Sequence, residues 1–169
     1  MRWLFGLVLA VTLCVAGRAD AATPGLVGNF QDWNVYALDQ DSGRLCYVAS
    51  EPKKQDGNYK RRGPAAVIVA RLPGETGTEQ VSVQPGYAYK EGSNVKVTVD
   101  GQEFSLFTKG EHAWTNSSKE DAALIAAMQG GKNLTVRGTS TRDTWSLDTY
   151  SLLGFTAAHK AMRDACGSA

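Results

Sequence analysis

Apolar and polar residues alternate with a period of two along much of this chain, which is typical of β-strands with one buried face. The alternation is clearest at 95–99, where three valines are separated by Lys96 and Thr98. Residues 65–72 instead form a short, β-branched apolar run, which favours a buried strand over a helix. The segment before residue 30 is expected to be a loose lead-in. The expected strands cover residues 30–38, 45–50, 65–72, 80–84, 95–99, 102–106, 134–136 and 145–147.

A two-residue turn joins two of these strands. Asp100–Gly101 is a strong hairpin signal, because both residue types tolerate the positive φ angles that such a turn requires. A turn at this place would put the apolar side chains of both strands on one face of the sheet. The expected partners are Val99 with Gln102, Val97 with Phe104 and Val95 with Leu106.

Two helices interrupt the β pattern. Ser117 followed by Glu120 has the spacing of a capping box, and Gly130–Gly131 marks the end of that helix. A second helix is expected over 154–165, near the C-terminus. Its apolar stripe, at i, i+3, i+7 and i+11, consists of Phe155, Ala158, Met162 and Cys166. The pattern therefore predicts one mainly β domain with two short helices.

The first 21 residues have the features of a secretory signal peptide. Arg2 precedes an apolar run over 3–16, and Ala19-x-Ala21 fits a signal-peptidase site. The run is shorter than the ~20 residues that a membrane-spanning helix needs, although an uncleaved anchor stays open. We expect cleavage after Ala21, a mature domain over 22–169 without a transmembrane segment, and a location in the periplasm or beyond it.

Cleavage would leave two cysteines, Cys46 and Cys166. An exported chain with one pair of cysteines is expected to form one disulfide, although two free thiols remain the alternative. This bridge would tie the C-terminal helix to an early strand.

Six segments of the chain share a pattern with a known family: 30–35 (FQDWNV), 45–47 (LCY), 81–83 (VSV), 86–87 (GY), 113–114 (AW) and 148–158 (DTYSLLGFTAA), ending at Cys166. These motifs resemble the invasion-associated locus B family of bacterial proteins. Gln31 stands where the family opening usually has glycine, and Tyr36 stands where some members have another cysteine. The resemblance implies a small exported protein with a β-sandwich-like fold, and named members are associated with entry of pathogens into host cells.

Signals for catalysis, metal binding or a cofactor are missing from the sequence. It contains no His-Glu-x-x-His, Cys-x-x-Cys or Gly-x-Ser-x-Gly motif, and its histidines are His112 and His159 alone. Each is expected to be a half-buried or surface residue, although a hydrolase site assembled in space stays open. The net charge of +1, which becomes zero after cleavage, disfavours a nucleic-acid binder.

Positive charge is concentrated in one polar segment, 51–63, which is expected to be a long exposed loop. It could present its cations to an anionic envelope or host-surface ligand or to an acidic protein, or simply keep the loop solvated. These candidate residues are Lys53, Lys54, Lys60, Arg61 and Arg62.

The aromatic residues mostly predict a core. Trp33, Trp114 and Trp145 are expected to be buried, whereas Tyr87 and Tyr89 are the better candidates for an exposed aromatic pair. The sequence favours a non-enzymatic exported protein that binds a partner through its loops. The alternatives are an uncharacterised periplasmic hydrolase and a structural protein of the envelope.

Overall fold

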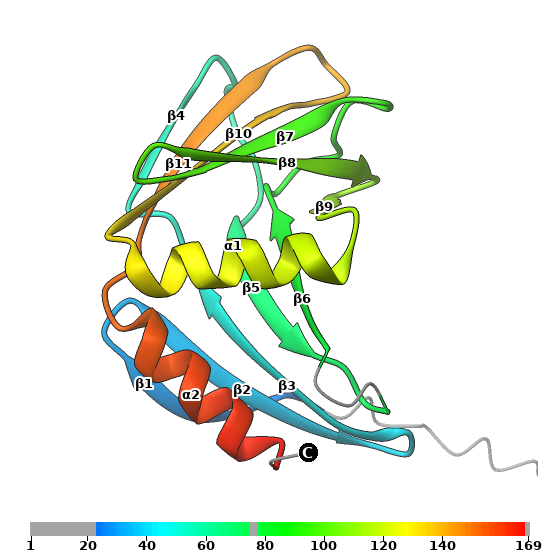
Figure 1. Cartoon of the computed structure of the whole chain (residues 1–169). Helices are drawn as coiled ribbons and strands as arrows, with labels where there is room; N and C mark the ends of the chain where they lie inside the picture. The colour runs from blue at the N-terminus through cyan, green and yellow to red at the C-terminus, as the bar shows by residue number, and fades with distance from the viewer. Residues whose placement is uncertain (1–22, 75–77, 168–169) are drawn as a thin grey trace, which may run out of the picture.

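The computed structural model describes residues 23–74 and 78–167 (Figure 1). The expected signal peptide, 1–21, lies outside the described residues. The strands are β1 (Gly25–Phe30), β2 (Trp33–Gln40), β3 (Gly43–Ser50), β4 (Lys54–Gly57), β5 (Ala66–Arg71), β6 (Glu79–Gln84), β7 (Asn94–Val99), β8 (Gln102–Lys109), β9 (His112–Trp114), β10 (Asn133–Thr139) and β11 (Trp145–Ser151). The helices are α1 (Ser118–Gly130) and α2 (Phe155–Ala165).

The strands form one antiparallel sheet in the order β1-β2-β3-β5-β6-β9-β8-β7-β10-β11-β4. Short β9 joins two halves: β1, β2, β3, β5 and β6 lie on one side of it, and the remaining strands lie on the other. Figure 1 shows α2 over β1–β3 and α1 running across the region between the halves. Buried side chains of both halves, such as Val48 and Leu134, belong to one hydrophobic core. The expectation of a mainly β, sandwich-like fold is therefore confirmed, and both layers belong to one continuous sheet.

The sequence signals at the turn and the first helix act as expected. Asp100 and Gly101 adopt φ angles of 43° and 97°, and the β7–β8 register is the predicted one. The Ser117 hydroxyl accepts a hydrogen bond from the backbone N–H of Glu120 at 3.3 Å, so Ser117 is the N-cap of α1. The Glu120 carboxylate accepts from the backbone N–H of Asn116 instead of that of Ser117, so the second half of the capping box is displaced by one residue.

The C-terminal helix is held in place by packing and by a disulfide. Phe155, Ala158 and Met162 are fully buried, and α2 packs on β1, β2 and β3. Cys46 on β3 is bonded to Cys166 at the end of α2, with their Cα atoms 5.8 Å apart. Both the predicted helix stripe and the predicted bridge are confirmed.

The expected loose lead-in is wrong, because residues 25–30 form the edge strand β1. The expected strand 30–38 is in fact two strands joined by the tight turn Gln31–Asp32. The sequence of β1, GLVGNF, contains two glycines and no regular alternation, and most of it is exposed. An edge strand of this kind is held by backbone hydrogen bonds, which leave no hydrophobic pattern in the sequence.

Gln31 adopts a φ of 59°, in the left-handed region that glycine enters without steric cost. We expect Gln31→Gly to raise the free energy of unfolding by about 0.5 kcal/mol, because the relieved strain exceeds the added flexibility of the unfolded chain. Urea unfolding followed by tryptophan fluorescence would measure the change. Gln31→Ala is the control, since it keeps the Cβ atom; equal stability of the two variants would contradict the prediction.

The expected long loop at 51–63 is also partly wrong. Lys54–Gly57 forms β4, which pairs with β11 at the other edge of the sheet. Its sequence, KQDG, is polar throughout and carries no apolar alternation that could have marked a strand. Trp33 is fully buried as expected, whereas Trp114 and Trp145 are only half-buried.

Candidate anion-binding cleft

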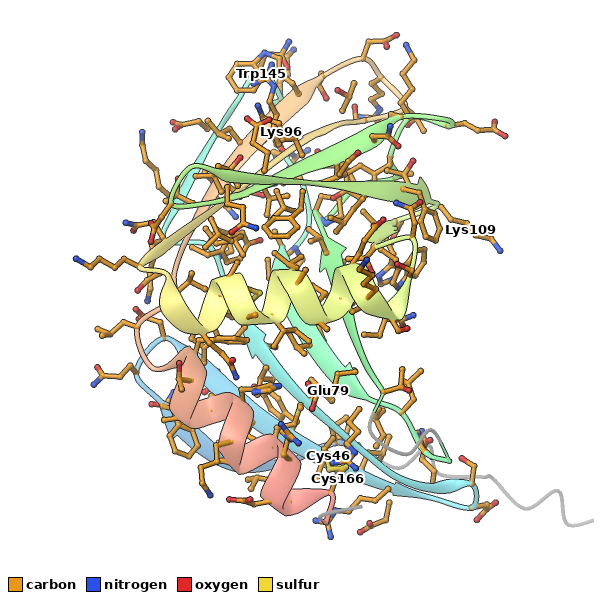
Figure 2. The ribbon with its side chains drawn as sticks, in the orientation of Figure 1. Cys46, Glu79, Lys96, Lys109, Trp145 and Cys166 are labelled. Atoms are coloured by element: carbon orange, nitrogen blue, oxygen red, sulfur yellow. A yellow bond between two sulfur atoms is a disulfide. The ribbon has the colours of Figure 1, made fainter. Side chains whose placement is uncertain are left out.

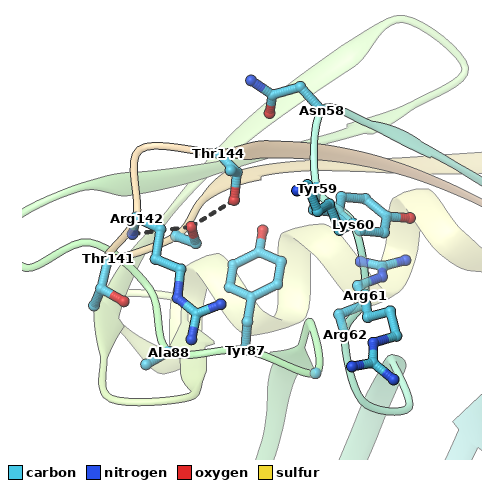
Figure 3. A pocket seen from close by; sticks show the side chains of 12 residues that line it. Asn58, Tyr59, Lys60, Arg61, Arg62, Tyr87, Ala88, Thr141, Arg142 and Thr144 are labelled. Carbon is cyan, nitrogen blue, oxygen red and sulfur yellow. Dashed lines mark hydrogen bonds between the residues drawn. The ribbon is translucent and has the colours of Figure 1, made fainter.

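A cleft of about 690 Å³ opens where two loops that connect the halves of the sheet meet a third loop of the second half (Figure 3). The loops follow β4, follow β6, and join β10 to β11. The lining residues are Asn58, Tyr59, Lys60, Arg61, Arg62, Gly86, Tyr87, Ala88, Ser140, Thr141, Arg142 and Thr144. The volume lies within the range of small-molecule sites, ~300–1,000 Å³.

Backbone hydrogen bonds bring these three loops together. The N–H of Gly63 donates to the carbonyl of Gly86 at 2.8 Å, and the N–H of Thr141 donates to the carbonyl of Ala88 at 3.0 Å. Gly86 has a φ of 77°, and a Cβ atom there would overlap the Gly63 carbonyl, so the close approach requires glycine. The cleft walls are therefore fixed by main-chain contacts.

The cleft is positively charged. Its lining contains Lys60, Arg61, Arg62 and Arg142, and none of the described lining residues is a carboxylate. Lys60, Arg61 and Arg142 are exposed, and no ion pair joins any of them to a carboxylate within residues 23–74 and 78–167. Asp143 follows Arg142 in the chain, but its carboxylate is paired with Lys90 at 2.5 Å and lies outside the lining. The three exposed cations are thus available to an anionic ligand.

Arg62 differs from these cations because its side chain is buried in an ion pair. Its guanidinium donates two hydrogen bonds to the Asp148 carboxylate, one of them from Nη1 to Oδ2 at 2.8 Å, and a further one to the carbonyl of Pro85 at 3.2 Å. The side chains of Arg62 and Asp148 are only 3% and 1% exposed. Burial raises the pKa of Asp148, and the ion pair with Arg62 opposes that shift. The expectation that Arg62 is an exposed cation is therefore wrong, because its side chain is buried in the pair with Asp148.

A group of tyrosines lies beside this ion pair. The Tyr87 hydroxyl shares a 2.7 Å hydrogen bond with Ser146, and its ring meets that of Tyr89 edge-on, with centroids 5.4 Å apart. Tyr89 is 3% exposed and Tyr150 is fully buried, and burial raises the pKa of both phenols. The two better candidates for an exposed aromatic pair therefore do not form one, because Tyr89 belongs to the core and only Tyr87 reaches the cleft.

Three buried polar atoms in this region have no hydrogen-bond partner among the described protein groups: Nε of Arg62 and the hydroxyls of Tyr89 and Tyr150. Such atoms are rare, because an unpaired buried donor costs about 1–3 kcal/mol. The polar groups beneath the cleft are therefore incompletely satisfied by the protein itself.

The five cations predicted from the sequence do not form one patch. Lys60, Arg61 and Arg62 line the cleft, but the Arg62 side chain is buried in its ion pair. Lys53 is paired with Asp32 at 2.5 Å and Lys54 with Asp56 at 2.8 Å, and neither lines the cleft. Arg142 was missed, because residues 140–143 look like an ordinary polar turn and nothing in the sequence places them beside residue 60.

The two histidines are used in packing. His159, expected to be half-buried or exposed, is 3% exposed. Its Nδ1 accepts from the Gln129 amide at 3.1 Å, and its Nε2–H donates to the Glu79 carboxylate at 2.7 Å. His112 stacks on the ring of Trp114 with centroids 5.4 Å apart. Within residues 23–74 and 78–167 no three His, Cys, Asp or Glu side chains are grouped as metal ligands would be.

Glu79 links β6 to α2 and gives a pH-dependent contribution to stability. Burial raises its pKa, but the hydrogen bond from His159 and the positive charges of Arg163 and Arg71 lower it more strongly, so the net pKa is below the usual 4.5. A depressed carboxyl pKa stabilises the fold above the unfolded-state pKa and loses this contribution as the pH falls through the folded-state value.

We therefore expect Glu79→Gln to lower the free energy of unfolding by about 1–2 kcal/mol at pH 7, the scale of a hydrogen bond to a charged group. The difference from the unchanged protein should shrink as the pH falls below 4.5, the usual value of this carboxyl. Urea unfolding at pH 7, 5 and 3 measures it, with Glu103→Gln, on an exposed side chain, as control. A difference that is constant across the three pH values would contradict the assignment.

A family model for the invasion associated locus B (IalB) protein matches residues 33–163, which is more than half of the chain. The chain belongs to the invasion-associated locus B family. The crystal structure of invasion associated protein B from Bartonella henselae shares this locus B fold, with a TM-score of 0.59 and 17% sequence identity. The match covers 83% of this chain and 98% of that chain. The curated proteins contain no significant match to this locus B protein.

Family membership confirms the resemblance of the sequence motifs. Gln31, just before the matched residues, has a left-handed φ, the conformation that glycine adopts without steric cost. Among the described residues of this locus B protein, no helix is both long and apolar enough to cross a membrane.

Proposed function

We propose that this locus B protein is a non-enzymatic binding protein of the bacterial envelope, and that its cleft holds an anionic group of its partner. One observation carries the proposal: Lys60, Arg61 and Arg142 converge from two distant segments on one cleft without a carboxylate among its described lining residues. Cations held together without counter-charges repel one another, and a bound anion relieves this repulsion.

The predicted export signal and the family membership support a role outside the cytoplasm. The Bartonella relative is called an invasion associated protein. By analogy, we infer that the partner of this chain is found on the envelope or on a host surface, where anionic ligands are common. A structural envelope protein with no ligand is the outcome that a negative binding result would favour.

The hydrolase alternative has no comparable support in the described residues. A histidine that activates a nucleophile needs a ring nitrogen free to accept its proton. In His159 one nitrogen accepts from Gln129 and the other donates to Glu79. His112 lies on β9 and is outside the cleft lining.

The proposal is tested by titrating the disulfide-bonded protein with two anions, tripolyphosphate and a heparin-derived tetrasaccharide, by calorimetry at low and high salt. We expect the dissociation constant of at least one anion to rise about tenfold or more in Arg61→Gln/Arg142→Gln, since each lost charged contact is worth about 1 kcal/mol or more. Lys109→Gln/Lys132→Gln is the matched control, because both lysines lie outside the cleft lining. No binding, or binding that is equal in the two double variants, would overturn the proposal.

A further inference from the structure

We infer that the ligand of the cleft is an acidic saccharide, a sugar with sulfate or phosphate ester groups. This inference rests on the proposed function, since it assigns a chemical class to the ligand of the same site. Three features of the cleft carry it: the separation of its charges, the neutral polar groups beside them, and a buried hydrogen-bond donor that has no acceptor among the described protein groups.

The cations lie on two walls with neutral groups between them. Figure 3 shows Arg142 on one side, Lys60 and Arg61 on the other, and Tyr87 in the middle. The arrangement fits a ligand whose uncharged body spans the cleft and whose anionic substituents reach both walls.

The wall that carries Arg142 also offers groups that suit sugar hydroxyls. Ser140 and Thr144 share a 2.7 Å hydrogen bond, and the Ser140 oxygen also accepts from the N–H of Arg142 at 3.1 Å, which orders this wall. Thr141 is exposed at the rim of the cleft. Hydroxyls both donate and accept, so they pair equally well with the hydroxyls of a sugar ring. With Tyr59 and Tyr87, five of the twelve lining residues carry a hydroxyl, which suits a polar, uncharged body between the cations.

Tyr59 and Tyr87 add aromatic surface to the lining. The guanidinium carbon of Arg62 lies over the Tyr59 ring, 4.9 Å from the ring centroid, and this contact holds the ring against the buried ion pair. Tyrosine presents an apolar face together with a polar tip, which matches the alternating C–H and O–H groups of a sugar. Both rings are half-buried and are therefore already ordered before a ligand arrives, which reduces the entropy cost of binding.

The buried hydrogen-bond donor without an acceptor is Nε of Arg62. Arg62 lines the cleft, its side chain is 3% exposed, and Nε has no acceptor among the described protein groups. An oxygen of a ligand, either directly or through one water molecule, would complete its hydrogen bonding. This donor points to an oxygen-rich ligand independently of the exposed cations.

Acidic saccharides occur in bacterial lipopolysaccharide and in host glycosaminoglycans, so the experiment uses one probe from each source. The probes are the deacylated glucosamine disaccharide bisphosphate of the lipopolysaccharide anchor and a heparin-derived tetrasaccharide. Tripolyphosphate serves as the anion without a sugar. Calorimetric titration of the full disulfide-bonded protein gives the three dissociation constants at one salt concentration.

Two variants then test the neutral part of the cleft without changing its charge. Thr141→Val removes one hydroxyl with little change in shape, and Tyr59→Leu removes one aromatic ring. Thr108→Val, on β8 outside the lining, is the control for loss of a hydroxyl. Urea unfolding of each variant separates a loss of binding from a loss of fold.

We expect at least one saccharide to bind about tenfold or more tightly than tripolyphosphate. Each cleft variant should weaken that saccharide about threefold to tenfold, as loss of one hydrogen bond or ring contact does, and leave tripolyphosphate unchanged. The preferred probe identifies the source. If tripolyphosphate binds as tightly as both saccharides, and only Arg61→Gln/Arg142→Gln weakens it, the saccharide inference is overturned while the anion site stands. If no anion responds to the loss of Arg61 and Arg142, the proposed function itself is overturned.

Discussion

Reduction of the Cys46–Cys166 disulfide is expected to lower the free energy of unfolding by about 4–5 kcal/mol. The bond closes a loop with a sequence separation of 120, and in the chain-entropy description the stabilisation grows with the length of the closed loop. Cys46 is fully buried on β3, so the bond also holds α2 against the core strands (Figure 2). Urea unfolding of the oxidised and the reduced protein, followed by tryptophan fluorescence, measures the difference.

The double variant Cys46→Ala/Cys166→Ala provides the control for this experiment. It should be as unstable as the reduced protein, and added reductant should not change it further. A free energy of unfolding of the reduced protein within about 1 kcal/mol of that of the oxidised protein would be a difference much smaller than the loop-closure effect. That result would show that α2 is held by its apolar stripe alone.

Asp148→Ala is expected to destabilise the protein by about 3–5 kcal/mol, the usual cost of removing one partner from a buried ion pair. The variant would leave the Arg62 guanidinium buried with only the Pro85 carbonyl as acceptor, beside an Nε that already has no protein partner. Thermal or urea unfolding measures the loss.

Two further variants distinguish an unpaired charge from a simple loss of packing. Arg62→Met/Asp148→Leu removes both charges and keeps an apolar filling, so its stability should lie within about 1–2 kcal/mol of the unchanged protein. Asp56→Ala, in an exposed pair with Lys54, should change stability by about 0.5 kcal/mol or less. A loss below about 1 kcal/mol in Asp148→Ala would mean that water reaches Arg62 in the folded protein.

Features encoded in neighbouring residues could be predicted from the sequence. The β7–β8 hairpin follows from Asp100–Gly101, the start of α1 from Ser117, and the buried stripe of α2 from its helical spacing. In each case the signal and the structure lie within a few residues of one another. The disulfide could be predicted for a different reason, since an exported chain with two cysteines leaves one possible pairing.

The centre of the candidate site could not be predicted, because its inward-facing residues are polar. On β11 the buried positions are Ser146, Asp148 and Tyr150, whereas the apolar Trp145 and Leu147 lie on the other face. The alternation of apolar and polar residues alone would assign Trp145 and Leu147 to the core, and it therefore predicts the wrong buried face for this strand. Asp148 is buried because Arg62 pairs with it, and the two residues are 86 positions apart in the chain.

For the same reason the sequence could not predict the place of Arg142 in the cleft or the contact between Glu79 and His159. Each depends on which loops and helices meet in space, and no local motif records that. The basic segment 51–63 contains Lys60 and Arg61, which line the cleft, and their role in ligand binding stays a prediction for the titrations above to test. The segment could not reveal which of its cations would be used for internal pairing.

The packing of α2 on the first strands also determines when folding of the protein can be completed. Trp33 on β2 packs against Phe155 and donates a hydrogen bond to the carbonyl of Ser151, 118 positions further along the chain. A chain that emerges N-terminus first, from a ribosome or through a translocation channel, therefore exposes Trp33 until residues 151–155 have appeared. A chain truncated before Phe155 would lack both the cover for Trp33 and the second cysteine of the bridge. Burial of Trp33 and closure of the disulfide are thus late events in folding, because both wait for residues 151–166 however early β2 itself is made.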